Sequence, residues 1–333
     1  MIFSLIICTY KRPKPIISLL DSVVLQTVYP NQILIIDGSI DNETADVINS
    51  SMYDNLIYYK VPPEHRGLTR QRNYGMERII TSAEVVCFLD DDTILESNYF
   101  EELIKTYQND ISIIGVGGVD TINNNWKYKE AGIIYNKHKC FCFEDYFYPE
   151  GLRNVIRNYL GLSSNLGPGK MPEFSHGRTC GFPLNGKIYE VDLLIGMSFS
   201  FKRIVTDNCK FSSYFEGYGL YEDVDYSIRA QQYGINVINT NAKLAHYHDA
   251  SGRPNQYQYG KMVVRNGWYV WRIKNPKPLL DARLKWHAIT ILLTVIRFSN
   301  TFTTRDKKQA FTEALGRTIG WWSLCFNKPR HVN

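Results

Sequence analysis

Long apolar runs are absent from this 333-residue chain. No uninterrupted apolar stretch approaches the roughly 18 residues that a membrane-spanning helix needs, so we expect no transmembrane segment. The apolar stretch at residues 2–8 has no charged segment before it and runs directly into Thr9-Tyr10-Lys11-Arg12. That arrangement is typical of a first core strand and not of a signal peptide, so we expect a cytoplasmic protein.

A cysteine framework is absent as well. The seven cysteines are an odd number without regular spacing, which argues against a disulfide scaffold and favours a reduced environment. His138, Cys140 and Cys142 are close enough in sequence to suggest a metal site, but no second pair of ligands matches them. Alternation along a strand is therefore the favoured interpretation. Internal repeats and low-complexity tracts are also missing, and the length suits one large or two modest domains.

Acidic residues are scarce at the C-terminal end. Residues 261–333 contain 14 Lys and Arg but only 3 Asp and Glu, whereas the whole chain has a net charge of +5. Such a split indicates an anionic partner for this end. The segment is apolar at residues 286–298 and carries several tryptophans, namely Trp268, Trp271, Trp321 and Trp322. A basic helix of this kind, too short to span, is typical of one lying on an anionic membrane surface. A helical cap packed on the core is the alternative, and the two are compatible.

The first 119 residues alternate between two kinds of pattern. Short apolar runs rich in β-formers predict strands at residues 2–8, 33–36, 56–61, 85–89 and 113–119. Helical patterns lie between them, and Pro13, Asn42 or Asp41, Thr69 and Ser97 are the residues expected to begin those helices. This alternation predicts an α/β fold with a mostly parallel, Rossmann-like central sheet flanked by helices.

The pattern changes after residue 119. Residues 120–190 show no sustained periodicity but are rich in aromatic side chains, which argues against simple disorder. Strand character returns at residues 191–201, 235–238 and 243–248, and a helix is expected at residues 222–233.

Three consecutive carboxylates, Asp90, Asp91 and Asp92, directly follow the apolar run at residues 85–89. A run this short and apolar is typical of a strand buried on both faces, and open α/β sheets bind ligands at the carboxyl ends of such strands. Oxygen ligands of this kind suit Mg²⁺ or Mn²⁺, with phosphate supplying further oxygens. The alternative is a solvated acidic loop.

Further polar groups follow other strand ends or begin helices. They are Thr9, Tyr10, Arg12, Asp37, Arg70, Arg72 and Asn73. Because the predicted sheet would bring these positions to one edge, we expect them to meet the three aspartates and to suit a nucleotide's base, ribose and phosphates.

A second acidic group, Glu222, Asp223 and Asp225, stands at the expected start of a helix. Carboxylates there also stabilise the helix end, so helix capping is the alternative to a catalytic role. His246 and His248 lie beyond it on one face of an extended segment, where they are candidate metal ligands.

In this order the motifs resemble those of the bacterial-type, inverting family 2 glycosyltransferases with the GT-A fold, over about residues 1–250. The motifs are Ile7-Cys8-Thr9-Tyr10, Asp37-Gly38-Ser39-Ile40-Asp41, Gly67-Leu68-Thr69-Arg70-Gln71-Arg72-Asn73, Asp90-Asp91-Asp92, Gly196-Met197-Ser198-Phe199, Glu222-Asp223 and His246. The resemblance implies transfer of a sugar from a nucleotide sugar to an acceptor hydroxyl, with inversion and a divalent metal, Mn²⁺ or Mg²⁺. In the family an extra residue commonly separates the acid and the glycine of the second motif, whereas here Asp37 directly precedes Gly38.

The resemblance also implies a role for each residue. Donor binding would involve Thr9, Tyr10, Arg12, Asp37, Arg70, Arg72, Asp90 and Asp91, with Asp90 at the ribose. Asp92 and His246 would hold the metal, and Asp223 would be the catalytic base. Gly196, Met197, Glu222 and His248 would lie on the acceptor side or support the site.

These expectations divide the chain at residue 255. Residues 1–255 would form the catalytic domain, with a nucleotide-sugar-binding half at 1–119 and an acceptor-side half at 120–255. Residues 256–333 would form a basic, mainly helical extension.

The expected partners are a nucleotide-sugar donor and a glycan or lipid-linked glycan acceptor, in cell-surface polysaccharide or glycolipid assembly. No nucleic acid is expected. An anionic membrane surface would give the protein a peripheral position on the inner face of the cytoplasmic membrane.

Two other functions stay open on the sequence. Residues 88–93 superficially resemble the motif of haloacid-dehalogenase-like phosphohydrolases, although the glycine expected before Thr93 is missing. A carbohydrate-binding protein without catalysis is the other alternative.

Overall fold

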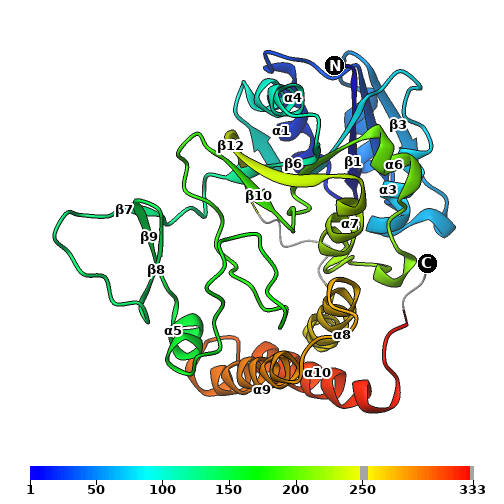
Figure 1. Ribbon diagram of the computed structural model, residues 1–333. Coiled ribbons are helices and arrows are strands. Elements are labelled where there is room, and N and C mark those ends of the chain that lie inside the picture. Colours follow the sequence, from blue (N-terminus) through cyan, green and yellow to red (C-terminus); the bar gives the residue numbers. More distant parts are fainter. Residues whose placement is uncertain (248–253, 331–333) are drawn as a thin grey trace. The chain divides into compact units, whose positions relative to one another are not determined.

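The computed structural model describes residues 1–247 and 254–330 (Figure 1). The chain divides into two compact units. Unit 1 consists of Met1–Asn123 and Leu184–Arg253, and unit 2 consists of Asn124–Pro183 and Pro254–Asn333. Each unit is thus built from two separate stretches of chain. The division predicted at residue 255 from the sequence remains a prediction.

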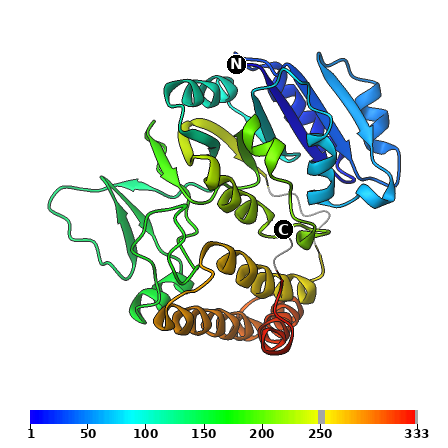
Figure 2. The ribbon, with the colours of Figure 1, turned by 45° about the vertical axis from the view of Figure 1, so that its right-hand side comes forward.

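Unit 1 contains a nine-stranded sheet whose main path runs β10-β12-β6-β11-β4-β1-β2-β3, with β5 paired to β12. The strands are β1 (Phe3–Thr9), β2 (Gln32–Asp37), β3 (Leu56–Lys60), β4 (Val85–Asp90), β5 (Thr93–Leu95), β6 (Ile113–Asp120), β10 (Ile188–Val191), β11 (Ser198–Lys202) and β12 (Ile235–His246). Strands β1 to β4 pair in parallel, as do β6 and β12, whereas β11 lies antiparallel between β4 and β6. Figure 2 shows the blue N-terminal strands side by side. The predicted α/β class, with a central sheet flanked by helices, is confirmed.

Helices of unit 1 pack against this sheet. They are α1 (Pro13–Val24), α2 (Glu43–Asn49), α3 (Leu68–Met76), α4 (Tyr99–Asn109), α6 (Arg203–Asn208) and α7 (Glu222–Ala230), with single turns η1 (Pro63–His65), η2 (Ser213–Phe215) and η3 (Gln231–Tyr233). The apolar positions of α1 at helical spacing are buried in the same core cluster as alternate residues of β1 and β4. Strands β2 and β4 are buried almost throughout, which explains why their sequences are apolar without alternation.

Two predicted helix starts were wrong. Helix α3 begins after Gly67, whose φ of 110° is a conformation that favours glycine, and Thr69 lies buried within the first turn. The backbone N–H of Leu68 donates to the carbonyl of Gly217, so a contact distant in sequence sets this start. Helix α4 begins after Asn98 instead of Ser97.

The two strands predicted at residues 235–238 and 243–248 form one strand, β12. Its pairing with β6 shifts register between Ile238 and Lys243, which is a bulge and not a break in the strand. His248 lies outside the described residues, so its predicted role stays a prediction.

Unit 2 combines a small sheet with helices. Its three-stranded sheet, in the order β7-β9-β8, consists of β7 (Lys127–Tyr128), β8 (Cys140–Phe143) and β9 (Tyr146–Pro149), and its helices are α5 (Leu152–Tyr159), α8 (Gln256–Lys274), α9 (Leu280–Thr303) and α10 (Lys307–Phe326). The strand predicted around Cys140 and Cys142 is confirmed. None of the described helices is both long and apolar enough to cross a membrane.

Helices α8 and α10 of unit 2 meet backbone to backbone. A Cβ added to Gly260 would lie 2.2 Å from the carbonyl oxygen of Glu313, and one added to Gly316 would lie 2.1 Å from that of Tyr257. Nearby, the rings of Trp271 and Trp286 stack with centroids 5.1 Å apart. The C-terminal helices are therefore closely packed on one another.

Candidate active site

The carboxyl ends of three parallel strands meet at one edge of the unit 1 sheet. The pairing register places Thr9 beside Asp37 and Cys8 beside Asp90. The side-chain amide of Gln71, on α3, donates to the carbonyls of Thr9 (3.0 Å) and Ile36 (2.7 Å). This residue, whose part the sequence did not reveal, fixes the ends of β1 and β2 to each other.

Asp90, Asp92 and His246 converge beyond the end of β4. Each offers a ligand atom, and the three atoms lie within 4.8 Å of one another. His246 Nε2 is 3.1 Å from Asp92 Oδ1 and 4.0 Å from Asp90 Oδ2. His246 comes from a distant part of the chain because β12 pairs antiparallel with β5, which sets it beside Thr93.

The charge balance of this group favours a cation. Burial alone would lower the pKa of His246, but the hydrogen bond to Asp92 and the charges of Asp90 and Asp92 raise it above its ordinary value. Carboxylate oxygens with one imidazole nitrogen form a ligand set that suits Mn²⁺ or Mg²⁺. Across the described residues, no other group of three His, Cys, Asp or Glu side chains is arranged this way.

Asp91 has a different environment from its two neighbours. It is 3% exposed, and it accepts hydrogen bonds from the hydroxyl of Thr9 and from the guanidinium of Arg12, both at 2.7 Å. Burial raises its pKa to about 6, and these two contacts partly offset the shift. Arg12 also lies 3.4 Å from Asp92. Thr9 and Arg12 therefore contact the aspartates through Asp91.

Asp37 is fully buried at the end of β2. Its carboxylate accepts one bond from the backbone N–H of Ser39 and another from the hydroxyl of Tyr58, both at 2.7 Å. Tyr58, on β3, gave no signal in the sequence beyond its place in a strand. Of the other predicted donor-binding residues, Tyr10 is exposed, and Arg70 forms an ion pair with Glu216.

Arg72 connects the metal-ligand group to the start of α7. Its guanidinium, which is only 2% exposed, pairs with Glu222, lies 3.4 Å from Asp90 Oδ1, and donates to the carbonyl of Gly196 at 3.2 Å. The ring of Phe199 lies beneath it, 4.8 Å away. One buried cation thus holds two carboxylates from distant parts of the sequence.

Asp223 is held at the first turn of α7. Its Oδ2 accepts from the backbone N–H of Gly196 (2.9 Å) and its Oδ1 from the N–H of Val224 (2.8 Å). Tyr221, just before the helix, has a φ of 72°, a left-handed conformation that is uncommon for a residue other than glycine. Burial raises the pKa of Asp223, and burial likewise raises the pKa of Glu222 to about 8.

The turn at Gly196 and Met197 joins the two groups. A Cβ on Gly196 would lie 3.1 Å from Glu222 Oε1 and 3.3 Å from the Cβ of Asp223, so a side chain here would crowd both acidic residues. The carbonyl of Met197 accepts from the backbone N–H of Asp90 at 3.2 Å. Gly196 and Met197 were predicted to support the site, and that role stays a prediction. The structure shows that they contact Glu222, Asp223 and Asp90.

Sequence comparisons find transferases. The family model described as glycosyl transferase family 2 matches residues 4–161. The chain is similar to a glucosyl-dolichyl phosphate glucuronosyltransferase of Haloferax volcanii, at 29% identity over 127 residues, which are 37% of this chain and 39% of the relative. It is also similar to the glycosyltransferase GlyA of Streptococcus pneumoniae serotype 4, at 35% identity over 98 residues, or 28% of this chain and 14% of the relative. The matches thus span less than half the length of these curated relatives.

Several solved structures are similar to this chain in fold. The structure of GalNAc-T7 with UDP, GalNAc and Mn²⁺ has a TM-score of 0.55 at 16% identity and covers 82% of this chain and 49% of that one. The mannosyltransferase PcManGT from Pyrobaculum calidifontis, in complex with GDP-Man and Mn²⁺, has a TM-score of 0.53 at 12% identity and covers 98% of this chain and 88% of that one. The match to the family 2 model thus covers residues 4–161, and the fold is similar to that of the GT-A glycosyltransferases.

Proposed function

We propose that the chain is a metal-dependent inverting glycosyltransferase that moves a sugar from a nucleotide-sugar donor to an acceptor hydroxyl. The observation that carries the proposal is the linkage of two acidic groups within unit 1. One is the metal-ligand-like group of Asp90, Asp92 and His246, and the other is Asp223, with Arg72 and Gly196 between them. Inverting transfer needs both a group that stabilises the departing diphosphate and a base for the acceptor proton.

For the first requirement we assign the metal to Asp92 and His246, with Asp90 within reach. Asp90 presents Oδ1 to Arg72 and Oδ2 to His246, so one carboxylate contacts both a buried cation and the candidate metal group. A bound Mn²⁺ or Mg²⁺ would offset the negative charge of the diphosphate. Asp90 also remains our assignment for the donor ribose.

For the second requirement we assign the base to Asp223. The two backbone N–H groups hold its carboxylate in one orientation, and its raised pKa makes the ionised carboxylate a better proton acceptor than that of an ordinary aspartate. Glu222 keeps Arg72 in place, which makes it a positioning residue in this proposal.

The proposed acceptor is a glycan or lipid-linked glycan in cell-surface polysaccharide or glycolipid assembly. The name of the Haloferax relative, which includes a dolichyl phosphate, supports a lipid-linked acceptor. The named ligands of the solved structures, UDP and GDP-Man, support a nucleoside diphosphate sugar as the donor.

A screen of nucleotide sugars for slow metal-dependent hydrolysis tests this function directly. We expect one or a few donors to release nucleoside diphosphate and sugar when Mn²⁺ or Mg²⁺ is present, because water replaces the missing acceptor. Release of phosphate from simple phosphate esters, without any use of nucleotide sugars, would favour the phosphohydrolase. Donor-independent glycan binding with no hydrolysis would favour a carbohydrate-binding protein.

The pH dependence of transfer gives a second test. Because only the ionised form of Asp223 accepts a proton, kcat/KM should fall as the pH drops through its raised pKa. The acidic limb should therefore lie above the range of an ordinary aspartate, which is about pH 4. A profile of kcat/KM at saturating metal from about pH 4 to pH 8 measures it. A flat profile down to the ordinary range would contradict the assignment.

We further propose an anionic membrane surface as a partner of the C-terminal helices. Exposed apolar side chains recur at helical spacing on α9 and α10; they are Leu280, Leu284, Ile291, Val295, Phe298 and Phe302, then Phe311, Leu315, Ile319, Trp322 and Phe326. These helices belong to the segment with 14 basic and 3 acidic residues. Apolar stripes beside basic side chains suit the interface of an anionic bilayer, to which each Lys or Arg contributes roughly 1 kcal/mol.

Vesicle partitioning tests this partner. Replacing Leu284 and Phe302 together by serine should weaken binding to anionic vesicles at least about tenfold, because each insertion is worth on the order of 1 kcal/mol or more. The double variant Met52→Ser/Ile111→Ser is the control, because these apolar side chains of unit 1 are even more exposed than Leu284 and Phe302. Binding should also weaken with salt. If both double variants bind the vesicles equally well, the membrane proposal is wrong, and the C-terminal helices are only a packed cap. Deleting residues 285–333 is a poorer test, because it removes Trp286 from its stack on Trp271.

A further inference from the structure

A second cluster of charged side chains lies in unit 2, and none of its residues has a role in the proposed transfer. Arg157, on α5, is only 6% exposed. Its Nη2 donates to two backbone carbonyls, those of Leu162 (3.2 Å) and His176 (2.9 Å), while its Nε has no hydrogen-bond partner. Within the described part of the chain, no carboxylate lies within ion-pair distance of it. A buried guanidinium of this kind is costly unless an anion accompanies it.

A second arginine adds to this charge. Arg178 pairs with Glu150, and its Nε also lacks a hydrogen-bond partner. Glu150 accepts a further bond from Asn154 at 2.8 Å, so one carboxylate is shared between these groups. Burial, together with the charges of Arg153 and Arg178, lowers the pKa of Arg157 to about 10. The cluster therefore keeps an excess of positive charge.

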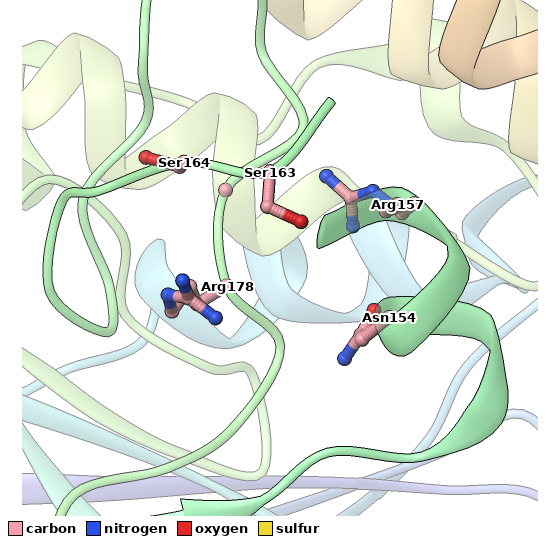
Figure 3. Close-up of a pocket in the computed structure, with 6 residues that line it drawn as sticks. Asn154, Arg157, Ser163, Ser164 and Arg178 are labelled. Atoms are coloured by element: carbon pink, nitrogen blue, oxygen red, sulfur yellow. The ribbon is translucent and has the colours of Figure 1, made fainter. Parts of the chain in front are cut away.

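These groups line a small pocket (Figure 3). Its lining residues are Asn154, Arg157, Ser163, Ser164, Gly177 and Arg178. In Figure 3 the Ser163 hydroxyl lies on the same side as the Arg157 guanidinium, with Arg178 across from them. The cavity volume is about 10 Å³, roughly the space of a single water molecule. A sugar ring, a base or a whole phosphate group is too large for it, whereas one oxygen of an acid group held at its mouth is not.

We propose that this pocket receives one oxygen of the terminal acid group of a ligand, either a phosphate or a carboxylate, while the rest of the ligand stays outside. Arginine side chains present N–H groups in a planar fork that matches the oxygens of both groups, and a serine hydroxyl adds a further donor. The anion supplies the charge that Arg157 lacks. The proposal concerns binding alone and does not depend on glycosyl transfer.

Phosphate binding to the full chain tests the proposal. Inorganic phosphate is titrated in excess EDTA, so that no metal recruits it to the aspartates, and heat release is compared with chloride at equal ionic strength. We expect saturable binding of phosphate that chloride does not reproduce. Arg157→Met should weaken it at least about tenfold, since hydrogen bonds to charged groups are the strong ones.

Two further variants keep the result interpretable. Arg153→Met removes an equal charge from an exposed position on the same helix and should leave the phosphate affinity within about twofold. Ser163→Ala should weaken binding several-fold without endangering the fold, should Arg157→Met fail to fold. Absence of saturable binding, or equal affinity of the unmodified and Ser163→Ala proteins, would overturn the site.

Methyl phosphate and acetate, titrated in the same way, separate the two sources of the acid group. Tighter binding of methyl phosphate would assign the pocket to a phosphate ester, such as a lipid phosphate. Tighter binding of acetate would assign it to a carboxylate, such as that of an acidic sugar. If neither methyl phosphate nor acetate binds saturably, the proposal is contradicted.

Discussion

Replacement of Asp92 by alanine is expected to abolish sugar transfer and metal-dependent donor binding. Asp92 is 7% exposed, and its two oxygens face His246 and Arg12. Its loss removes one ligand and also the carboxylate that orients His246. Because a bound metal stabilises developing charge by several kcal/mol, transfer should fall by about 10²-fold or more. Transfer rates and donor affinity, each measured with and without Mn²⁺, give the result.

The same experiment needs a control for fold and for charge. Asp110→Asn removes one negative charge from an exposed loop and should leave transfer unchanged within experimental scatter. The melting temperature of Asp92→Ala should stay close to that of the unmodified chain if the effect lies in the site. Full transfer activity of the unmodified chain in excess EDTA would refute the metal assignment.

Asp223→Asn is expected to lower kcat by about 10²–10⁴-fold, the usual contribution of a general base, with donor KM little changed. The substitution nearly preserves the shape of the side chain. It does not preserve both hydrogen bonds, because each carboxylate oxygen accepts from a backbone N–H and one of them would face the new amide N–H₂. Thermal unfolding must therefore be measured beside the kinetics.

Asp225 offers a matched control on the same helical turn. Asp225→Asn also removes a carboxylate from the start of α7, but this side chain contacts Arg229 and not Gly196. It should lose stability while retaining turnover within about tenfold, a loss far below that of a general base. Near-normal turnover of Asp223→Asn would make Asp223 structural, and Glu222 would become the next candidate.

Much of the fold of unit 1 could be predicted from the sequence because its central strands are buried on both faces. Runs such as those of β2 and β4 are short, apolar and rich in β-formers, and no helix fits their length. The helix starts and the continuity of β12 were less predictable. The start of α3 depends on a contact between Leu68 and Gly217, and β12 passes through a bulge that resembles a break between strands.

The grouping of the candidate site could be predicted where acidic residues directly follow a strand end in the sequence, as at Asp90 and Asp92. The sequence could not distinguish the surroundings of three adjacent, chemically identical aspartates, and Asp91 turned out to be enclosed by Thr9 and Arg12. Residues such as Tyr58 act through geometry alone. Their side chains are ordinary for a strand or helix, so only the folded arrangement reveals their contacts.

The interleaved make-up of the two units has a consequence for the order in which a growing polypeptide can fold. Residues 124–183 leave the ribosome long before α8, yet Glu173 receives hydrogen bonds from Trp271 and Leu279. The tight contact between Gly260 and Glu313 forms later still, when α10 has been made. Unit 1 has all of its chain by residue 253, so it can complete its sheet while the middle segment waits for its partners. A nascent chain halted within α9 would carry a finished unit 1 and an unfinished unit 2.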